Sequence, residues 1–203
     1  MKEEHWFEKV AEHLGSAYLR YSFTYGTTQE VDVLMNVLAL KPGDSLLDVG
    51  CGPGRHAHEF AARGIKVTGL DISKDFIELA NLQSSENSVF VCGDAKDMNY
   101  KDEFDAVISL CQGAFGLAGG PTVQKSKGDP DGVILSLMTQ ALKPEKKLAL
   151  SAFSSYFQIR YLNEEAEFNA DTGVNHETTS VKNESGESLE TVLWTSCFTL
   201  REL

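Results

Sequence analysis

Apolar residues along this chain fall into short continuous runs separated by stretches with helical spacing. The runs have the length and composition of buried parallel strands, and the residues after the first run, 55–63, have the spacing of a helix. Such alternation predicts an α/β fold with a doubly wound, mostly parallel sheet. The expected strands are residues 46–49, 66–70, 88–92, 104–109 and 147–153.

The ends of the chain depart from this alternation. Residues 5–18 and 29–39 read as two helices that cap the sheet. Residues 168–182 and 188–198 read as the strands of a β-hairpin, because residues 183–187 have a turn composition. We therefore expect one domain over 1–203, with cap helices in 1–40, a ligand-binding core in 41–153 and a lid in 154–198.

The last residues have the spacing of a helix start. Thr199 and Glu202 match a capping box, a hydroxyl at the N-cap and a glutamate three residues later. Residues 199–203 then predict the first turn of a helix that is cut short, in a truncated or naturally short chain. We also expect an exposed sheet edge and a homodimer contact there.

A glycine-rich loop follows the first strand and carries the strongest chemical signal. Gly50, Gly52 and Gly54 lie two residues apart where a strand passes into a helix, which is typical of a ligand that presses against bare backbone. A dinucleotide loop needs a third glycine where Arg55 stands, and a P-loop needs Gly-Lys-Ser/Thr. Both phosphate interpretations are therefore weakened.

Acidic residues follow the next two expected strands. Asp71 ends the second strand and Asp94 follows the third, and a carboxylate in the first of these positions can accept hydrogen bonds from both hydroxyls of a ribose. The ligand is therefore expected to contain a nucleoside.

Taken in order, these motifs resemble the class I, Rossmann-like S-adenosylmethionine-dependent methyltransferases of the small-molecule type. The resemblance covers about residues 30–153. It is carried by Asp48-Val49-Gly50-Cys51-Gly52-Pro53-Gly54, Asp71-Ile72-Ser73, Gly93-Asp94-Ala95, Phe104-Asp105-Ala106-Val107-Ile108-Ser109 and Leu142-Lys143-Pro144.

The resemblance implies roles for individual residues. The glycines would make room for the methionyl part of S-adenosylmethionine, Asp71 would bind its ribose, and Ile72 would pack on the adenine. Asp94 and Ala95 would meet the adenine edge. The other expected cofactor-binding residues, in the first loop and after the fourth strand, are Asp48, Cys51 and Leu110. Asp48 would lie near the methionyl amine or would cap amides of its own loop.

Acceptor and catalytic candidates come from three segments outside the glycine loop. Residues 18–27 pack the cap onto the sheet or form a flap in which Tyr21 or Tyr25 reaches the ligands. Gln112 orients a substrate or holds its own loop, and no Asn/Asp-Pro-Pro-aromatic signature occurs there. In the lid, the candidates for lining the site are Asp171, Asn175, His176 and Trp194. Among these candidates we name His176 and Tyr21 as catalytic, and Tyr25, Gln112, Asp171 and Trp194 as substrate-binding.

Composition and charge limit the classes of partner that we expect for this chain. The net charge of −12 opposes binding to nucleic acid. Residues 161–203 hold nine acids and two bases, which indicates a solvated face or a site for a cationic or amine acceptor. We expect a cytoplasmic protein, because the sequence has no apolar stretch near the ~20 residues of a membrane span, no signal peptide and four scattered cysteines. No metal site is expected.

The function expected from the sequence is methyl transfer from S-adenosylmethionine to a small molecule, with release of S-adenosylhomocysteine. One alternative is a chain that binds the cofactor as a sensor or partner subunit without turnover. The other is a nicotinamide-dependent oxidoreductase, against which Arg55 and the Asp94 motif argue.

Overall fold

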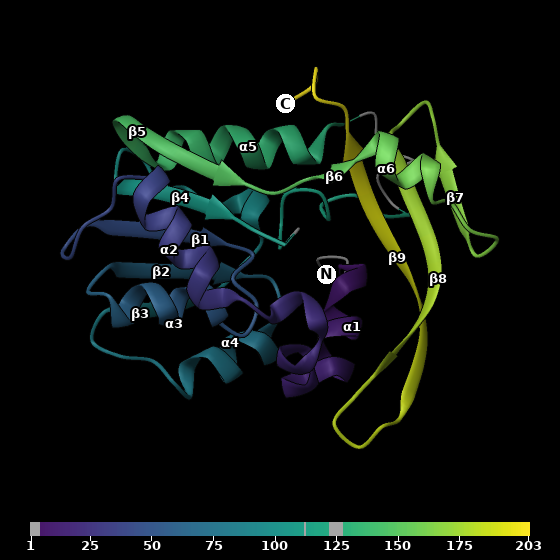
Figure 1. The fold of residues 1–203 in the computed structure, drawn as a ribbon, viewed down its shortest axis with the longest axis horizontal. Helices are drawn as coiled ribbons and strands as arrows, with labels where there is room; N and C mark the ends of the chain where they lie inside the picture. The colour runs from purple at the N-terminus through teal and green to yellow at the C-terminus, as the bar shows by residue number, and fades with distance from the viewer. Residues whose placement is uncertain (1–4, 112, 122–127) are drawn as a thin grey trace.

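Five parallel strands form the central sheet, in the order β3-β2-β1-β4-β5 (Figure 1). The computed structural model describes residues 5–111, 113–121 and 128–203. The strands are β1 Ser45–Val49, β2 Lys66–Asp71, β3 Ser88–Cys92, β4 Phe104–Ser109 and β5 Leu142–Leu150. This sheet confirms the predicted fold class. The strand order reverses beside β1, so the crevice for a ligand lies at the carboxyl ends of β1 and β4.

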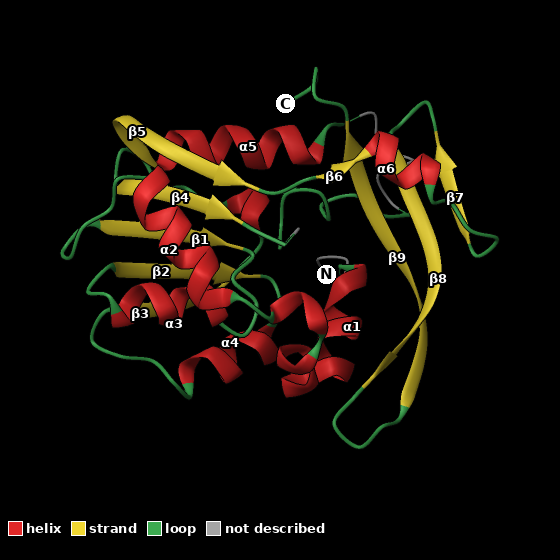
Figure 2. Ribbon diagram, in the orientation of Figure 1, coloured by secondary structure: helices red, strands yellow, loops and turns green. Residues whose placement is uncertain are grey.

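Helices cover both faces of this sheet, as Figure 2 shows. Leu46 packs in a buried core with Val31 and Phe60, whereas its neighbour Leu47 packs in a second core with Met138. Successive strand residues point to opposite faces, so the two cores lie on the two sides of β1. The helices are α2 Thr27–Val37, α3 Arg55–Ala62 and α4 Lys74–Asn81 around the first core, and α5 Pro130–Ala141 beside the second.

The N-terminal cap is shorter and more broken than predicted. α1 runs from Trp6–Leu14, and 3-10 helices at Gly15–Arg20 and Ser22–Thr24 follow it. Gly15 ends α1 at a φ of +49, a conformation that glycine adopts without strain. The helix expected over residues 5–18 therefore changes direction after Leu14, which moves every later side chain of the cap.

A second sheet, ordered β6-β9-β8-β7, stands beside the central one. Its members are β6 Phe153–Ser154, β7 Ala166–Asn169, β8 Val174–Lys182 and β9 Ser188–Phe198, with α6 Ser155–Arg160 after β6. β8 and β9 pair antiparallel and confirm the predicted hairpin. The strand expected over 168–182 is split by a turn at Gly173, whose φ is +68.

The tip of this hairpin is fastened to the N-terminal cap. The amide of Lys182 donates to the Tyr21 hydroxyl at 2.9 Å, and Arg20 pairs with Glu184 at 3.8 Å. Beneath the tip, Val181 joins a buried cluster with Val10 and Leu14. The hairpin therefore spans from the end of β5 to the cap (Figure 1).

β5 differs from its expected bounds, whereas a contact of the capping box expected at residues 199–202 is present. β5 was expected over 147–153, but it begins at Leu142 and ends at Leu150, with a register irregularity against β4. The amide of Thr199 donates to the Glu202 carboxylate at 2.6 Å within a turn. Among the described residues, no helix has both the length and the apolar character to cross a membrane.

Candidate functional site

The glycine loop after β1 lies directly against the loop after β4. Gly50 has a φ of +76, and a Cβ added there would lie 2.1 Å from the carbonyl carbon of Gly113. A Cβ added at Gly113 would likewise lie 2.1 Å from the carbonyl oxygen of Gly50. Only two bare backbones can come this close, and both glycines line the two cavities described below.

Asp71 holds the glycine loop from the end of β2. One carboxylate oxygen accepts the amide of Gly52 at 2.7 Å and the other accepts the amide of Ser73 at 2.8 Å. Burial raises the pKa of Asp71 to about 6, although these amides favour its charged form. Each oxygen keeps a lone pair, so the same carboxylate can accept hydrogen bonds from a ligand in either cavity.

Asp48, the residue before the last one of β1, is a buried acid with an unused oxygen. Its side chain is buried, and its Oδ2 has no hydrogen-bond partner among the described residues. Burial and then the neighbouring charge of Asp71 raise the pKa of Asp48 to about 7, while Arg55 opposes the shift. An unpaired buried carboxylate is costly, so this position favours a bound cation or a donor that supplies the missing bond.

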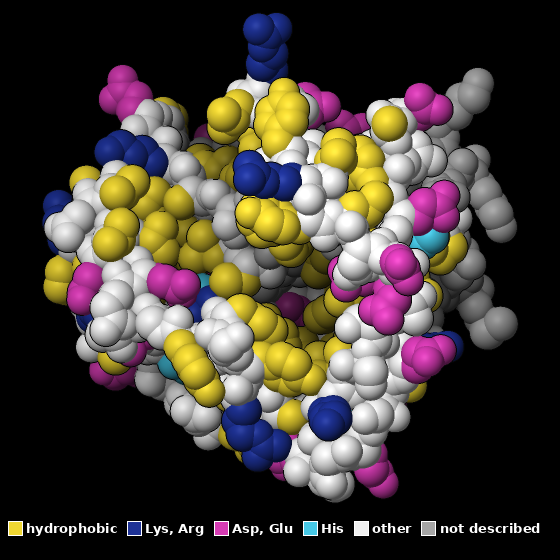
Figure 3. Space-filling view, turned by 45° about the vertical axis from the view of Figure 1, so that its right-hand side comes forward, with side chains coloured by type: hydrophobic (Ala, Val, Ile, Leu, Met, Phe, Trp, Pro, Cys, Tyr) yellow, Lys and Arg dark blue, Asp and Glu magenta, His cyan; other side chains and the backbone are white. Residues whose placement is uncertain are grey.

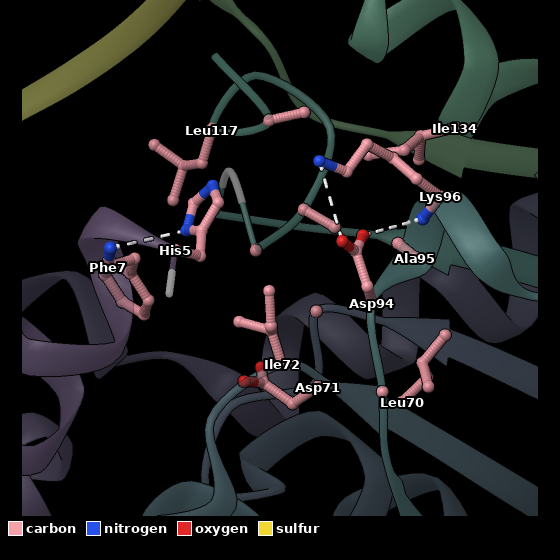
Figure 4. Close-up of a pocket in the computed structure, with 15 residues that line it drawn as sticks. His5, Phe7, Leu70, Asp71, Ile72, Asp94, Ala95, Lys96, Leu117 and Ile134 are labelled. Carbon is pink, nitrogen blue, oxygen red and sulfur yellow. Dashed lines mark hydrogen bonds and ion pairs between the residues drawn. The ribbon is translucent and has the colours of Figure 1, made fainter. Parts of the chain in front are cut away.

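A small cavity of about 40 Å³ lies at the ends of β2 and β3. Figure 4 shows His5 and Asp94 on opposite sides of it, with Ile72 between them. Its walls also include Ala95 and Ile134. The cavity thus combines apolar side chains with one acidic edge. This lining matches the chemistry of a flat heterocycle, and the cavity would have to widen to admit one.

The polar side chains of this small cavity are already hydrogen-bonded. Asp94 accepts the amide of Lys96 at 2.9 Å and pairs with its ammonium at 3.5 Å. Nδ1 of His5 accepts the amide of Phe7, and burial lowers the pKa of His5, as does the charge of Lys96. A ligand amine would therefore share Asp94 with Lys96. The sequence analysis did not predict that His5 lines this cavity, because it assigned residues 5–18 to a helix of the cap.

A larger cavity of about 520 Å³ opens from the small one, and we call it the aromatic chamber. The two cavities share Phe7, Gly50, Asp71, Gly113 and Leu117. Its remaining walls come from the cap, the glycine loop, α4, the ends of β4 and β5, and the lid: Trp6, Tyr18, Phe23, Gly52, Phe76, Cys111, Ser151, Phe153, Leu193 and Thr195. Figure 3 shows a hollow on this side of the molecule, ringed by hydrophobic side chains.

Arg55 ties the glycine loop to α2 and to the loop after β4. Its guanidinium donates to Glu30 and to Thr27 at 2.7 Å, and to Sγ of Cys111 at 2.9 Å. The amide of Cys111 in turn donates to Oγ of Ser151 at 2.7 Å. Arg55, which stands where a dinucleotide loop has its third glycine, thus makes three hydrogen bonds that hold Cys111 in the chamber wall.

The predicted cofactor residues cluster around these two cavities. Ile72, Asp94 and Ala95 line the small cavity, and Gly52 lines the chamber. Gly54 forms the N-cap of α3. Four predicted residues, Gly54 among them, do not line either cavity. Asp48 is buried in β1, and Cys51 is buried in the core, where burial raises the pKa of its thiol. Leu110 lines a groove beside α2.

The tyrosines predicted to reach the ligands do not line the site. The Tyr21 hydroxyl binds the backbone of Lys182, and Tyr25 is 70% exposed. Tyr18 lines the chamber instead, with its ring 5.0 Å from that of Phe76. Burial raises the pKa of Tyr18, so its hydroxyl stays protonated at neutral pH. Tyr18 lines the chamber in place of Tyr21 because residues 15–20 form a 3-10 helix and do not continue α1. The tighter helix changes the direction in which the following side chains point.

The lid candidates divide between the two faces of the hairpin. Leu193 and Thr195 line the chamber, so the alternate residue Trp194 points to the other face, where its ring stacks on that of His176 at 4.9 Å. His176 also pairs with Glu167 at 3.1 Å. The prediction that these two side chains line the site is therefore corrected by the strand register.

Two further candidates also lie away from the chamber. Asp171 is exposed in the turn before β8, and Gln112 lies outside the described residues. Asn175, in contrast, faces Thr195 across the hairpin and therefore shares its face. It is buried, and its Oδ1 has no partner among the described residues. No cluster of three or more possible metal-ligating side chains occurs in the described part of the chain.

Comparison with known proteins places this geometry in a family. Residues 40–195 match the family model described as a methyltransferase domain. The 27-O-demethylrifamycin SV methyltransferase of Amycolatopsis mediterranei is 40% identical over 91 residues, 41% of this chain and 34% of that protein. An uncharacterized methyltransferase of Schizosaccharomyces pombe is 32% identical over 132 residues, 63% of this chain and 84% of that protein.

The fold also matches solved structures. The CcbJ methyltransferase from Streptomyces caelestis superposes with a TM-score of 0.72 over 98% of this chain and 84% of its own, at 16% identity. At this identity the match concerns the fold alone. The chain spans between 19% and 43% of the length of the first four curated relatives that it matches.

Proposed function

The chain belongs to the methyltransferase domain family, and we propose that it transfers the methyl group of S-adenosylmethionine to a small-molecule acceptor and releases S-adenosylhomocysteine. One observation carries the proposal. An apolar cavity with one acidic edge adjoins the aromatic chamber, and Asp71 and the bare backbone at Gly50 line both. A nucleoside and a second molecule can therefore lie end to end.

The residues present fit this cofactor. Asp71 offers lone pairs to a ribose diol, and Ile72 offers an apolar surface to adenine. Asp48 supplies a buried carboxylate with an oxygen that lacks a partner in the described structure, which suits the methionyl ammonium. A Cβ at Gly50 would collide with the backbone of Gly113, so glycine at both positions keeps the two loops in contact beside the two cavities. Each part of the cofactor therefore has a chemically matched position.

The bound cofactor supplies an electrophilic methyl group on a sulfonium, so the protein mainly orients the reactants and excludes water. The aromatic walls around Phe7, Phe76 and Phe153 would exclude water from the chamber. Asp71 and Gly50 would fix the position of the nucleoside. No residue with a strongly basic side chain lines the described part of the chamber, which supports a mechanism based on alignment.

The acceptor is proposed to be a small molecule with an N–H or O–H group. The Oδ1 of Asn175 has no partner among the described residues and lies on the same lid face as Thr195, which lines the chamber. A donor group that reaches behind Thr195 would satisfy this oxygen. The rifamycin methyltransferase, to which the chain is similar, bears the name of a small-molecule substrate. The acids of residues 164–190 do not line the described chamber, so they do not support the cationic acceptor that their charge suggests.

Tyr18→Phe should lower kcat about 10-fold to 100-fold if the hydroxyl positions a reactant, since a hydrogen bond inside a dry site is worth roughly 1 to 3 kcal/mol. Because its pKa is raised, Tyr18 acts as a donor, and the pH profile should keep its shape. Steady-state kinetics over pH 6–9 would measure both. Tyr21→Phe is the matched control, since its hydroxyl bonds to the lid backbone outside the chamber; equal losses in both variants would contradict the role.

Binding of S-adenosylhomocysteine should weaken as the pH falls through about 7. The carboxylate of Asp48 has a raised pKa of about 7, so below this value it is protonated and cannot pair with the ammonium. One coupled proton changes affinity by at most about tenfold per pH unit. Calorimetry between pH 5.5 and 8 would measure the slope.

The apo protein should show the opposite pH dependence. The folded state binds this proton more tightly than the unfolded chain, so Asp48 lowers the free energy of unfolding as the pH rises from 3.8 to about 7. Asp48→Asn should flatten both curves. A binding slope that persists in Asp48→Asn would show that another group, such as Asp71, carries it.

Titration of the purified protein with S-adenosylmethionine, S-adenosylhomocysteine and NAD tests the proposal. Micromolar binding of the first two without the third is the expected result. Binding of NAD alone would favour the oxidoreductase alternative. Binding without turnover across an acceptor panel would favour the sensor or partner-subunit alternative. No binding of any of the three would reject the proposed function for this chain.

A further inference from the structure

We propose that a groove beside α2 binds the apolar tail of the methyl acceptor, so that the acceptor is an elongated and largely apolar molecule with its nucleophile at one end. This inference rests on the proposed function. It adds a second binding site to the chamber and defines the chemical class of the substrate.

The α2 groove has a volume of about 450 Å³ and runs between α2 and the ends of β4 and β5. Its lining consists of Gln29, Glu30, Val33, Leu34, His56, Leu110, Cys111 and Ser151. Val33 is 60% exposed, and Val37, one turn further along α2, is 54% exposed. A bound hydrocarbon would remove this apolar surface from water, which is favourable in proportion to the area covered.

The charged groups in the groove are already paired with one another. Glu30 accepts from Arg55 at 2.7 Å and from Nε2 of His56 at 2.8 Å. These bonds neutralise the carboxylate, and both partners are largely buried. The groove therefore offers a ligand apolar contact and no unpaired charge among its described residues, so a charged tail would lose its hydration without compensation.

The groove adjoins the aromatic chamber. Cys111 and Ser151 line both, and the hydrogen bond between them marks the boundary. A molecule that crosses this boundary has one end in the chamber, which continues to the proposed cofactor site, and the other end along α2. An acceptor confined to the chamber would leave the exposed side chain of Val33 in water.

A series of 4-alkylphenols tests the inference without knowledge of the natural acceptor. Each phenol, from 4-ethyl to 4-hexyl, is titrated by calorimetry into the protein saturated with S-adenosylhomocysteine. The phenol ring suits the aromatic chamber, and the alkyl chain is expected to enter the groove. Affinity should rise about twofold to fourfold per added methylene, because a fully buried methylene contributes about 0.8 kcal/mol.

Val33→Asn should reduce the increase in affinity per methylene to less than half of that in the unmodified protein, because a polar amide then lines the groove. The amide is neutral and avoids new repulsion with Glu30. Val133→Asn on α5 is the matched control, since Val133 is also an exposed valine on a helix, at 47%, and does not line the groove. The control should keep the gain of the unmodified protein.

Two results would overturn the inference. One is an affinity that does not change with chain length in the unmodified protein, and the other is an equal loss of the gain in both asparagine variants. Failure of S-adenosylhomocysteine to bind is detected in the first titration, before any phenol is added. That failure would reject the proposed function, and the inference with it, and it is distinguishable from a flat phenol series.

Discussion

Gly50→Ala should lower the free energy of unfolding by roughly 2 to 5 kcal/mol and abolish cofactor binding. A left-handed backbone conformation at a non-glycine residue costs about 1 to 2 kcal/mol, and overpacking adds about 1 to 3 kcal/mol. Both apply at Gly50, which has a φ of +76 and whose added Cβ would lie 2.1 Å from the backbone of Gly113. Urea denaturation and calorimetry would measure the two losses.

Two other glycines separate these contributions. Gly43 has a φ of +96 and open space around its Cβ position, so Gly43→Ala tests the backbone strain alone. Gly113→Ala tests the clash alone, because Gly113 is not in the left-handed region. If Gly50→Ala were no more destabilising than Gly43→Ala, the close contact between the two loops would be contradicted.

Asp71→Ala should weaken the binding of S-adenosylhomocysteine by about 10-fold to 100-fold or more and also destabilise the protein. Hydrogen bonds to a charged group contribute about 1.5 to 3 kcal/mol, and the variant would also leave the amides of Gly52 and Ser73 without acceptors. Calorimetry and thermal unfolding would report the two effects separately.

Asp71→Asn and Asp75→Ala are informative controls. Asparagine keeps the volume of Asp71 but turns an N–H₂ group toward one of the two amides, so loop positioning should still be impaired. Asp75 is an exposed acid at the start of α4 and carries the same charge. An affinity unchanged in Asp71→Ala, or reduced equally in Asp75→Ala, would exclude a direct role for the Asp71 carboxylate.

The central sheet and the glycine loop could be predicted because their signals are local. Apolar runs bounded by glycine at Gly50 and by acids at Asp71 mark strand ends that depend on a few neighbouring residues. The sequence also placed Asp71 beside the loop, since carboxyl ends of adjacent parallel strands meet at one edge of a sheet. These two residues were identified from the same features that position them.

The acceptor side of the site could not be predicted in the same way, because it depends on distant contacts. Tyr18 replaces Tyr21 in the chamber because Gly15 ends α1 early. Trp194 faces outward because β9 presents Leu193 and Thr195 to the chamber. Shifting the pairing of a strand by one residue moves every side chain to the opposite face of the sheet. The sequence alone does not define that register.

The walls of the aromatic chamber come from segments that lie far apart along the chain. Trp6 and Phe7 belong to α1, while Leu193 and Thr195 belong to β9. These segments meet only after a chain loop of nearly the full length has closed, a step that carries a large entropy cost and slows folding. During synthesis, a chain that has not yet reached residue 188 can hold the glycine loop but has no complete acceptor chamber. The capacity to bind both reactants therefore arises only after β9 has been added to the sheet.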